Sequence, residues 1–346
     1  MSNKFIVIAA FLAFFAGPAQ AEAPAATEKG AAPQFLFPVS CSLGEDCWTV
    51  NYDDSDAATG SAKDFRCGPR TYDGHDGTDF AIRDWVTMAG GVDVLAAAEG
   101  KIVRVRDEMD DLAPSAADLE KLRADKKGCG NGVLIDHGGG WQTIYCHMKK
   151  GSVVVKPDQK VATGQNIGQV GQSGLAEFPH LHFGVIHDGK MIDPFTGGEA
   201  TAACSATAQG APMWLEGLNV DYEPVTIYAA GFEPGEPDFE KIKNRAEGAP
   251  TVPHVLPVLT FWVSFYGVQE GDNIAITIAD PNGDPFASRD IVQDKTRARQ
   301  FYFVGKKIPH SLLFPGTYTG KAVITRRAAD GGTITRDVVK TIKVGP

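Results

Sequence analysis

Apolar and polar residues alternate in short runs along the first part of the chain, and glycines separate these runs. Runs of this kind are typical of β-strands whose two faces meet different environments. The runs cover residues 93–97, 101–106, 133–136, 143–147, 151–155 and 182–186. We therefore expect an antiparallel β domain from Phe35 to about Cys204, in a chain that is mostly β.

One segment of this region, residues 115–126, has a different pattern. At spacings that favour a short helix, charged residues separate the apolar positions Ala116, Ala117, Leu119 and Leu122. We expect a helical insertion between two strands, on the surface of the domain. A lid over a groove is the alternative interpretation.

Beyond residue 206 the apolar alternation becomes more regular. The alternating positions are Ile274, Ile276, Ile278, Ala322, Ile324, Val338 and Ile342. Turn residues stand at 281–283 and 330–332. This combination predicts a C-terminal β-sandwich, immunoglobulin-like, over residues 206–346, with the boundary in the Ala, Thr and Gly stretch 198–210. Its two histidines are scattered, so we expect no catalytic site there.

The first 21 residues have the features of a secretory signal peptide. Lys4 is followed by an apolar run over 5–17 and a small-residue cleavage site at 19–21. The run is shorter than the roughly 20 residues that span a bilayer, so no stable membrane insertion is expected. Residues 22–34 should be a flexible leader, and the mature protein should be periplasmic or extracellular.

All six cysteines follow this signal, and an even number in an exported chain favours disulfides. They are Cys41, Cys47, Cys67, Cys129, Cys146 and Cys204. We expect Cys129 to pair with Cys146, because the Gly-rich segment 136–140 between them resembles a hairpin tip. A cysteine zinc site is the alternative, but it favours paired C-x-x-C spacings, which the sequence lacks.

Acidic residues outnumber basic ones, and the formal net charge is −10. Nucleic-acid binding depends on neutralising phosphates with Lys and Arg, so this balance argues against it. Nor does the chain contain a basic run that would form a polyanion patch.

Half of the eight histidines lie in three short segments, 74–80, 144–147 and 179–184. Successive side chains of a strand point to opposite faces, so His180 and His182 should share one face. Such a pair on one face can serve a metal, although ordinary surface polarity is the alternative interpretation.

His75 and Asp79 are four residues apart, in a segment where Gly74 and Gly77 disfavour a helix. Zinc accepts imidazole nitrogen and carboxylate oxygen, and hydrolytic sites use three protein ligands and leave one position for water. His75, Asp79 and one histidine of the 180–182 pair would form such a set. By itself, the H-x-x-x-D spacing is a weak indication.

The stretch from about Asp73 to Phe195 resembles the lysostaphin and LytM-type zinc peptidases, which have a duplicated hybrid motif fold. The matching motifs are H-x-G-x-D at His75–Asp79, a histidine after a tyrosine at Tyr145-Cys146-His147, H-x-H at His180-Leu181-His182, and V-x-x-G-Q-x-I-G at 161–168. The three histidine motifs occur in the family's order. The insertion 115–126, Phe178 and Asp158 depart from its pattern and concern the groove more than the metal.

The resemblance implies that residues 35–205 form a zinc peptidase domain with one Zn²⁺, held by His75, Asp79 and His182. His147 and His180 would be the catalytic groups beside a zinc-activated water. The implied substrates are the stem or cross-link peptides of bacterial peptidoglycan.

Some side chains and functions have alternative assignments. Tyr145 is a weaker candidate for holding substrate or oxyanion, and an ordinary strand tyrosine is the alternative. Trp141 would line a groove or pack as a core aromatic. The alternatives to a peptidoglycan endopeptidase are a catalytically silent LytM-like regulator, or a general secreted metalloprotease. The C-terminal domain would then bind cell wall or a protein partner.

Overall fold

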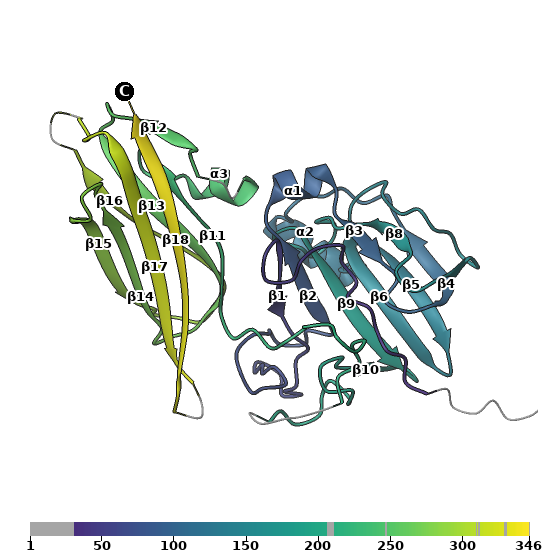
Figure 1. Ribbon diagram of the computed structural model, residues 1–346. Helices are drawn as coiled ribbons and strands as arrows, with labels where there is room; N and C mark the ends of the chain where they lie inside the picture. The colour runs from purple at the N-terminus through teal and green to yellow at the C-terminus, as the bar shows by residue number, and fades with distance from the viewer. Residues whose placement is uncertain are drawn as a thin grey trace, which may run out of the picture.

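The computed structural model describes residues 31–205, 211–245, 248–308, 310, 312–328 and 331–345. The expected signal peptide and most of the leader lie outside the described residues, as do positions 206–210 of the expected domain boundary. Within the described ranges, no helix has the length and apolar character needed to cross a membrane. Two β assemblies lie side by side (Figure 1).

The first assembly is built on an antiparallel sheet with the order β1-β2-β9-β6-β5-β4-β7, and β10 also pairs with β9. Its strands are β1 (Cys47–Asn51), β2 (Thr78–Ile82), β4 (Gly100–Arg106), β5 (Asn131–Gly138), β6 (Trp141–Met148), β7 (Lys160–Val161), β9 (His180–His187) and β10 (Lys190–Ile192). A small second sheet joins β3 (Asp93–Leu95) to β8 (Asn166–Gln169). The order of the strands in the sheet differs from their order in the sequence: β9, a late strand of the chain, lies between β2 and β6.

Five of the six strands expected here are confirmed, as β3, β4, β5, β6 and β9. The strand expected at 151–155 is wrong, because that segment is a loop. Two contacts anchor the loop instead: the Val155 side chain is buried, and the backbone N–H of the exposed Val154 donates to the Ile167 carbonyl at 3.2 Å. The pattern did not indicate β2, because all five of its residues are buried and no alternation is visible.

The helical insertion is confirmed as α2 (Ala116–Ala124), which lies in the connection between β4 and β5. Ser115 caps it: the Ser115 hydroxyl accepts from the Asp118 N–H, and the Asp118 carboxylate accepts from the Ser115 N–H. This reciprocal capping box satisfies backbone donors that the first helical turn leaves free. A shorter helix, α1 (Trp85–Gly90), follows β2.

The second assembly contains two sheets that share one apolar core, which is a β-sandwich arrangement. One sheet has the order β11-β13-β16, and the other has the order β12-β18-β17-β14-β15. The strands are β11 (Thr226–Glu233), β12 (Thr251–Pro253), β13 (Val258–Val268), β14 (Asn273–Ala279), β15 (Pro285–Val292), β16 (Arg297–Lys307), β17 (Gly316–Arg327) and β18 (Thr333–Gly345), and a helix, α3 (Phe239–Asn244), follows β11. The turn predicted at 281–283 joins β14 to β15, and Gly283 has the positive φ of 89° that favours glycine.

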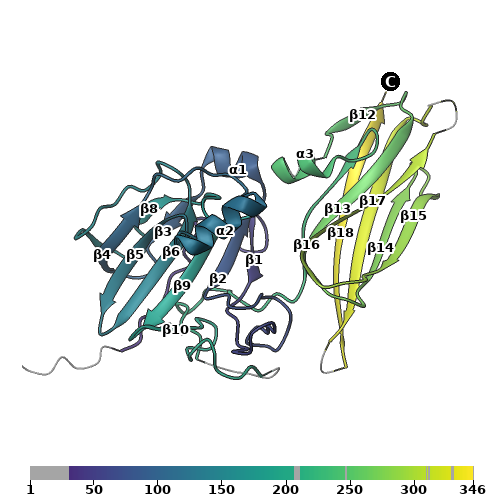
Figure 2. The same cartoon turned by 180° about the vertical axis from the view of Figure 1, so that it is seen from behind.

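The β1 edge of the first sheet faces the second assembly (Figures 1 and 2). An aromatic contact joins the two assemblies there. Trp48 of β1 lies against Tyr228 and Tyr266, whose rings stack with their centroids 4.1 Å apart. The Arg70 guanidinium is buried beside this contact and donates to the carbonyls of Thr49, Val50 and Tyr266. One charged group therefore satisfies backbone acceptors from both assemblies.

Three disulfides cross-link the described chain, and the expected Cys129–Cys146 pair is one of them. The other two are Cys41–Cys47 and Cys67–Cys204. The last of these closes a loop of 137 residues and ties the start of the first assembly to the end of its chain. All six cysteines are thus paired.

Asp193 directly follows β10 and is buried. One of its carboxylate oxygens has a hydrogen-bond partner and the other has none. Its Oδ1 accepts from the Phe195 N–H at 2.7 Å, whereas its Oδ2 is buried without a partner. Burial raises the pKa of Asp193 to about 7. The folded protein therefore favours the neutral carboxyl, and ionisation of this group opposes folding.

Arg70→Met should lower the free energy of unfolding by about 2–4 kcal/mol, because it leaves buried carbonyls at the interface without their donor. Urea unfolding followed by tryptophan fluorescence measures this loss. Arg104→Met, at an exposed position of β4, is the matched control and should change stability by no more than about 0.5 kcal/mol. Equal effects of the two substitutions would contradict the assigned role of Arg70.

Asp193→Asn should make the stability of the chelator-treated protein less dependent on pH. The folded pKa is raised, so the stabilising contribution is complete below the unfolded pKa of 3.8 and is lost as pH rises through about 7. A tenfold difference in the acid dissociation constant between the folded and unfolded states corresponds to about 1.4 kcal/mol of folding stability. Thermal unfolding at pH 5 and pH 8 should show a smaller difference for Asp193→Asn than for the wild type. The exposed Asp221→Asn control should keep the wild-type difference, and an unchanged difference in Asp193→Asn would refute this account.

Candidate functional site

The register between β2 and β9 brings the acidic and histidine motifs together. Asp79 lies directly opposite His182, and Ala81 lies opposite His180. The three polar side chains therefore share one face of the sheet. Leu181 and Phe183, both fully buried, point into the core on the other face. The shared face expected for the two histidines is confirmed.

His75 joins this face from the loop that precedes β2. Its Nε2 lies 3.1 Å from Asp79 Oδ1 and 3.1 Å from His182 Nδ1. The third side of the triangle, from His182 Nδ1 to Asp79 Oδ1, is 3.0 Å. All three residues are buried, with exposed fractions of 3%, 2% and 7%. Two imidazole nitrogens and a carboxylate oxygen converge on one point, and this donor set fits a zinc ion.

Each of these three side chains has a further partner that orients it. His75 Nδ1 faces the Tyr52 carbonyl at 2.7 Å and must donate to it, which leaves Nε2 free as a ligand atom. Asp79 Oδ2 accepts from Asn51 Nδ2 at 2.8 Å, and Asp76 lies 3.6 Å from His182 Nε2. Outer partners of this kind fix the tautomer and direction of metal-binding side chains.

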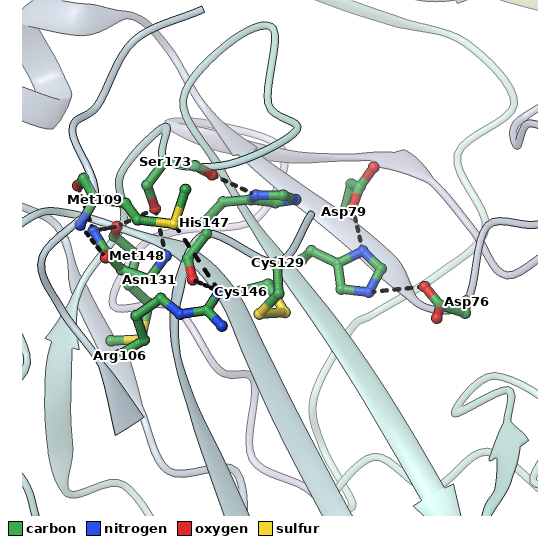
Figure 3. Close-up of a disulfide and its surroundings, with 12 residues drawn as sticks. Asp76, Asp79, Arg106, Met109, Cys129, Asn131, Cys146, His147, Met148 and Ser173 are labelled. Carbon is green, nitrogen blue, oxygen red and sulfur yellow. Dashed lines mark hydrogen bonds and ion pairs between the residues drawn. A yellow bond between two sulfur atoms is a disulfide. The ribbon is translucent and has the colours of Figure 1, made fainter. Parts of the chain in front are cut away.

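His147 and His180 lie beside the triangle, with their ring centroids 4.6 Å apart. Each uses Nδ1 to donate to a backbone carbonyl: His147 to Ser173 at 2.7 Å, and His180 to Phe178 at 2.8 Å. The Nε2 atoms are thus left as acceptors, and that of His180 lies 3.6 Å from Asp79 Oδ1. Figure 3 shows the His147 ring extending from the end of its strand toward Asp79.

The backbone at His147 interrupts the alternation of β6. Cys146 lies opposite His182, so a regular strand would send the next side chain into the core. His147 instead has a φ of 61°, in the left-handed region, and its ring reaches the site. Tyr145 does not: it is fully buried, and its hydroxyl accepts from the Ala97 N–H at 2.8 Å. The structural alternative for Tyr145 is therefore correct.

The charges of the site shift the pKa values of its members in opposite directions. Burial alone would lower the pKa of His75, but the Asp79 carboxylate outweighs it and raises the pKa to about 9. Burial likewise opposes the ionisation of Asp79, yet His75 and His180 hold its pKa well below the usual range. A proton on His75 thus balances the Asp79 charge, and a bound cation would replace that proton.

The pKa values of the two flanking histidines, His147 and His180, are lowered. Burial lowers the pKa of His180, and it lowers the pKa of His147 well below the ordinary value, with help from the positive charges that His180 and His182 would carry. Both rings are therefore neutral near neutral pH. Neutral imidazoles with a free Nε2 can accept protons.

The structure also places residues that no motif indicated. Asn51 and Tyr52 reach the site from β1 and the residue after it, and Ser173 reaches it from the loop before β9. Sequence patterns miss them because they act through a side-chain amide or backbone carbonyls. Trp141 is packed against His187 with the rings stacked 4.0 Å apart, so its core alternative is correct.

Comparisons with known proteins match the part of the chain that carries these residues. A family model described as "Peptidase family M23" matches residues 73–194. The peptidoglycan DD-endopeptidase ShyA of Vibrio cholerae is 34% identical over 119 residues, which are 34% of this chain and 22% of that protein. The DD-carboxypeptidase/endopeptidase Mpg of Neisseria meningitidis is 33% identical over 104 residues, which are 30% of this chain and 21% of that protein.

The chain thus spans about a fifth of the length of these curated relatives. Among solved structures, the catalytic domain of the antimicrobial peptidase lysostaphin from Staphylococcus simulans aligns with a TM-score of 0.28 and 23% identity. That alignment covers 42% of this chain and 86% of the lysostaphin chain. The family match and the histidine motifs fall on the same part of the chain: residues 73–194, which carry the five site residues, match the model of peptidase family M23.

Proposed function

We propose that this protein is an exported zinc metalloendopeptidase that hydrolyses peptide cross-links of bacterial peptidoglycan. The observation that carries the proposal is the buried triangle of His75 Nε2, Asp79 Oδ1 and His182 Nδ1, with sides of 3.0 to 3.1 Å. The M23 match over the same residues supports it. So do the names of the relatives, two of which describe peptidoglycan or DD-peptide hydrolysis.

His75, Asp79 and His182 would hold one Zn²⁺ in this proposal. Three protein ligands leave one coordination position open, as in other hydrolytic zinc sites. When bound, zinc supplies Lewis acidity that lowers the pKa of a water molecule and polarises a scissile carbonyl. The hydrogen bonds from Asn51 and to Tyr52 hold the ligands in place for this purpose.

His147 and His180 would move the protons. Both rings are neutral and donate from Nδ1 to a carbonyl, so Nε2 is the atom that accepts a proton from the attacking water. After that transfer, the protonated ring can return the proton to the leaving amine. The second ring, 4.6 Å away, would stabilise the developing oxyanion in its protonated form, in which Nε2 carries a hydrogen to donate. The two histidines would then divide the roles of base and electrostatic partner.

The insertion gives the site a neighbouring surface for substrate. A hollow of about 420 Å³ lies between α2 and the loop at Gly174, next to the Ser173 carbonyl that orients His147. Its walls include Met109 and Leu122 as well as Asp118 and Lys121. A peptide that bears both methyl and charged groups fits walls of this mixed character. We therefore place the peptide-binding groove between the insertion and the site.

The second assembly would act as an accessory domain. We propose a peptidase domain over 35–205 and a β-sandwich over 206–346, with cell wall or a protein partner as the ligand of the latter. Export to the periplasm or cell exterior follows from the same proposal, because peptidoglycan lies there. All five candidate site residues are present, and this favours an active enzyme over a silent regulator.

His75→Ala and His182→Ala should each remove zinc and abolish cross-link cleavage, because two ligands cannot keep the metal at this buried site. Elemental analysis of the purified protein measures zinc, and mass analysis of digested sacculi, with and without a chelator, measures cleavage. His187→Ala, whose ring is stacked on Trp141 away from the site, is the control and should keep both. Undiminished cleavage by either ligand variant would refute the mechanism.

His147→Ala should keep one zinc ion per chain and lower kcat by about 10²- to 10⁴-fold, since it removes a proton-transfer group and no ligand. Steady-state hydrolysis of a purified cross-linked muropeptide dimer, together with zinc analysis, tests this. Tyr145→Phe should leave kcat within about threefold of the wild type, because that hydroxyl is buried in the core. Loss of zinc from His147→Ala would mean that His147 is a ligand.

A further inference from the structure

We propose that the Cys129–Cys146 disulfide is a positioning element for His147: without this cross-link, turnover falls while zinc stays bound. The inference rests on the proposed function, because it concerns the proton-transfer step of that reaction. It goes further by assigning a role in proton transfer to a cross-link that supplies none of the three ligand atoms of the zinc triangle.

Cys129 is connected to His147 in two ways, through the disulfide to Cys146 and through a hydrogen bond. Cys146 immediately precedes His147 on β6 and is bonded through sulfur to Cys129. The Cys129 carbonyl also accepts a hydrogen bond from the His147 N–H at 2.8 Å. The Cα atoms of the two cysteines are 4.8 Å apart. Cys129 therefore fixes the backbone on the N-terminal side of His147 covalently and through a hydrogen bond (Figure 3).

This fixation acts on a conformation that the chain would not adopt by itself. A non-glycine residue in the left-handed region is uncommon, and it persists where the surroundings enforce it. At His147 the φ of 61° is what turns the ring to the site face, because a regular strand would send it into the core. Relaxation of this one torsion would withdraw the ring from the reaction.

A hydrogen-bond network holds the other side of His147. The Ser173 hydroxyl accepts from the Asn131 N–H at 2.8 Å and donates to the Met148 carbonyl at 2.8 Å. Asn131 Nδ2 donates to the Met148 carbonyl at 3.2 Å and to the Met109 carbonyl at 2.8 Å. This network fixes Met148 and the Ser173 loop, whose carbonyl orients the His147 ring. None of these four hydrogen bonds involves Cys129, which is held by the disulfide.

The position of Cys129 explains why a covalent link is useful there. Cys129 is where the insertion returns to the sheet, two residues before β5 begins at Asn131. The segment that precedes it, from Arg123 to Lys127, is exposed, so packing does little to hold it. The hydrogen bonds here involve the neighbours of Cys129: Arg106 donates to the Gly130 carbonyl at 3.0 Å, the Gly130 N–H donates to the Lys127 carbonyl at 2.9 Å, and the Leu175 N–H donates to the Gly128 carbonyl at 2.9 Å. Without the sulfur bridge, motion of the insertion would be passed on to the Cys129 carbonyl and from there to His147.

The zinc ligands have separate supports. His75 and Asp79 are oriented by Tyr52 and Asn51, and none of these residues lies on β5 or β6. His182 lies opposite Cys146 on β6, but β9 also pairs with β2 over four residues, and this second pairing holds His182 beside Asp79 whether or not the disulfide is present. Loss of the disulfide should therefore change the proton-transfer group and leave the metal in place. This separation is what the experiment measures.

The test compares two double variants of the full mature chain, Cys129→Ala/Cys146→Ala and the control Cys41→Ala/Cys47→Ala. The control also removes one partly exposed and one buried cysteine, at a bridge on β1, which β2 and β9 separate from the β6 strand of His147. For the first variant we expect kcat on a cross-linked muropeptide dimer to fall about 10- to 100-fold, with KM within about threefold and one zinc per chain. The control should keep kcat within about threefold.

A double-mutant cycle with His147→Ala distinguishes positioning from general destabilisation. If the disulfide acts through His147, its removal in the His147→Ala background should cause no further loss of kcat. An additional loss of the same size as in the wild type would overturn the proposal. So would an unchanged kcat in Cys129→Ala/Cys146→Ala, or a loss of zinc from it.

If that variant does not fold, the folded wild type and the Cys41→Ala/Cys47→Ala control are instead treated with a phosphine. The phosphine and one water molecule reduce a disulfide to two thiols, and the oxygen of the water ends in the phosphine oxide. Because Cys67–Cys204 is reduced in both samples, a Cys67→Ala/Cys204→Ala variant is treated in parallel. An equal fall in kcat in all three, with zinc retained, supports the proposal, and a kcat that survives reduction of the Cys129–Cys146 bridge overturns it. A wild type that cleaves no cross-links would instead contradict the proposed function, so the two failures are distinguishable.

Discussion

The antiparallel register of β2 with β9 is the constraint on which the rest of the site depends. It sets Asp79 beside His182 and leaves His180 two residues further along the same face. Because side chains alternate along a strand, a slip of one residue would turn both histidines into the core and expose Leu181 and Phe183. Those two apolar side chains are fully buried, and their packing is what prevents the slip. The metal geometry is therefore secured by the hydrophobic core on the opposite face.

Two independent supports surround this register. The ligand triangle is oriented from β1 by Asn51 and Tyr52, whereas His147 is held at the end of β6 by the Ser173 carbonyl and the Cys129 carbonyl. Metal affinity and proton transfer thus depend on different parts of the sheet. Trp48 adds a further connection, because it lies opposite Ala81 on the face that carries the site. The β-sandwich packs against that tryptophan, so the second assembly borders the face of the first sheet that carries the site.

The sequence predicted the parts of this arrangement that are written as local patterns. The H-x-H pair implied a shared face, the glycines around His75 excluded a helix there, and the Gly-rich segment at 136–140 implied the hairpin that brings Cys129 to Cys146. All three match the structure. The five side chains that converge at the site are the five that the family motifs indicated.

What could not be predicted depends on tertiary contacts. β2 and most of β13 are buried on both faces, so their sequences show no alternation. A regular strand would place Tyr145 on the same face as His147, and the left-handed φ at His147 breaks that rule. Asn51 and Ser173 act through groups whose partners are distant in sequence. No local pattern marks residues of this kind.

X-ray absorption at the zinc K-edge of the purified mature protein tests the central claim most directly. The account predicts a first shell of nitrogen and oxygen alone, at about 2.0–2.1 Å, with the outer scattering of two imidazole rings. A shell that contains sulfur at about 2.3 Å, or a protein that binds no zinc, would contradict it.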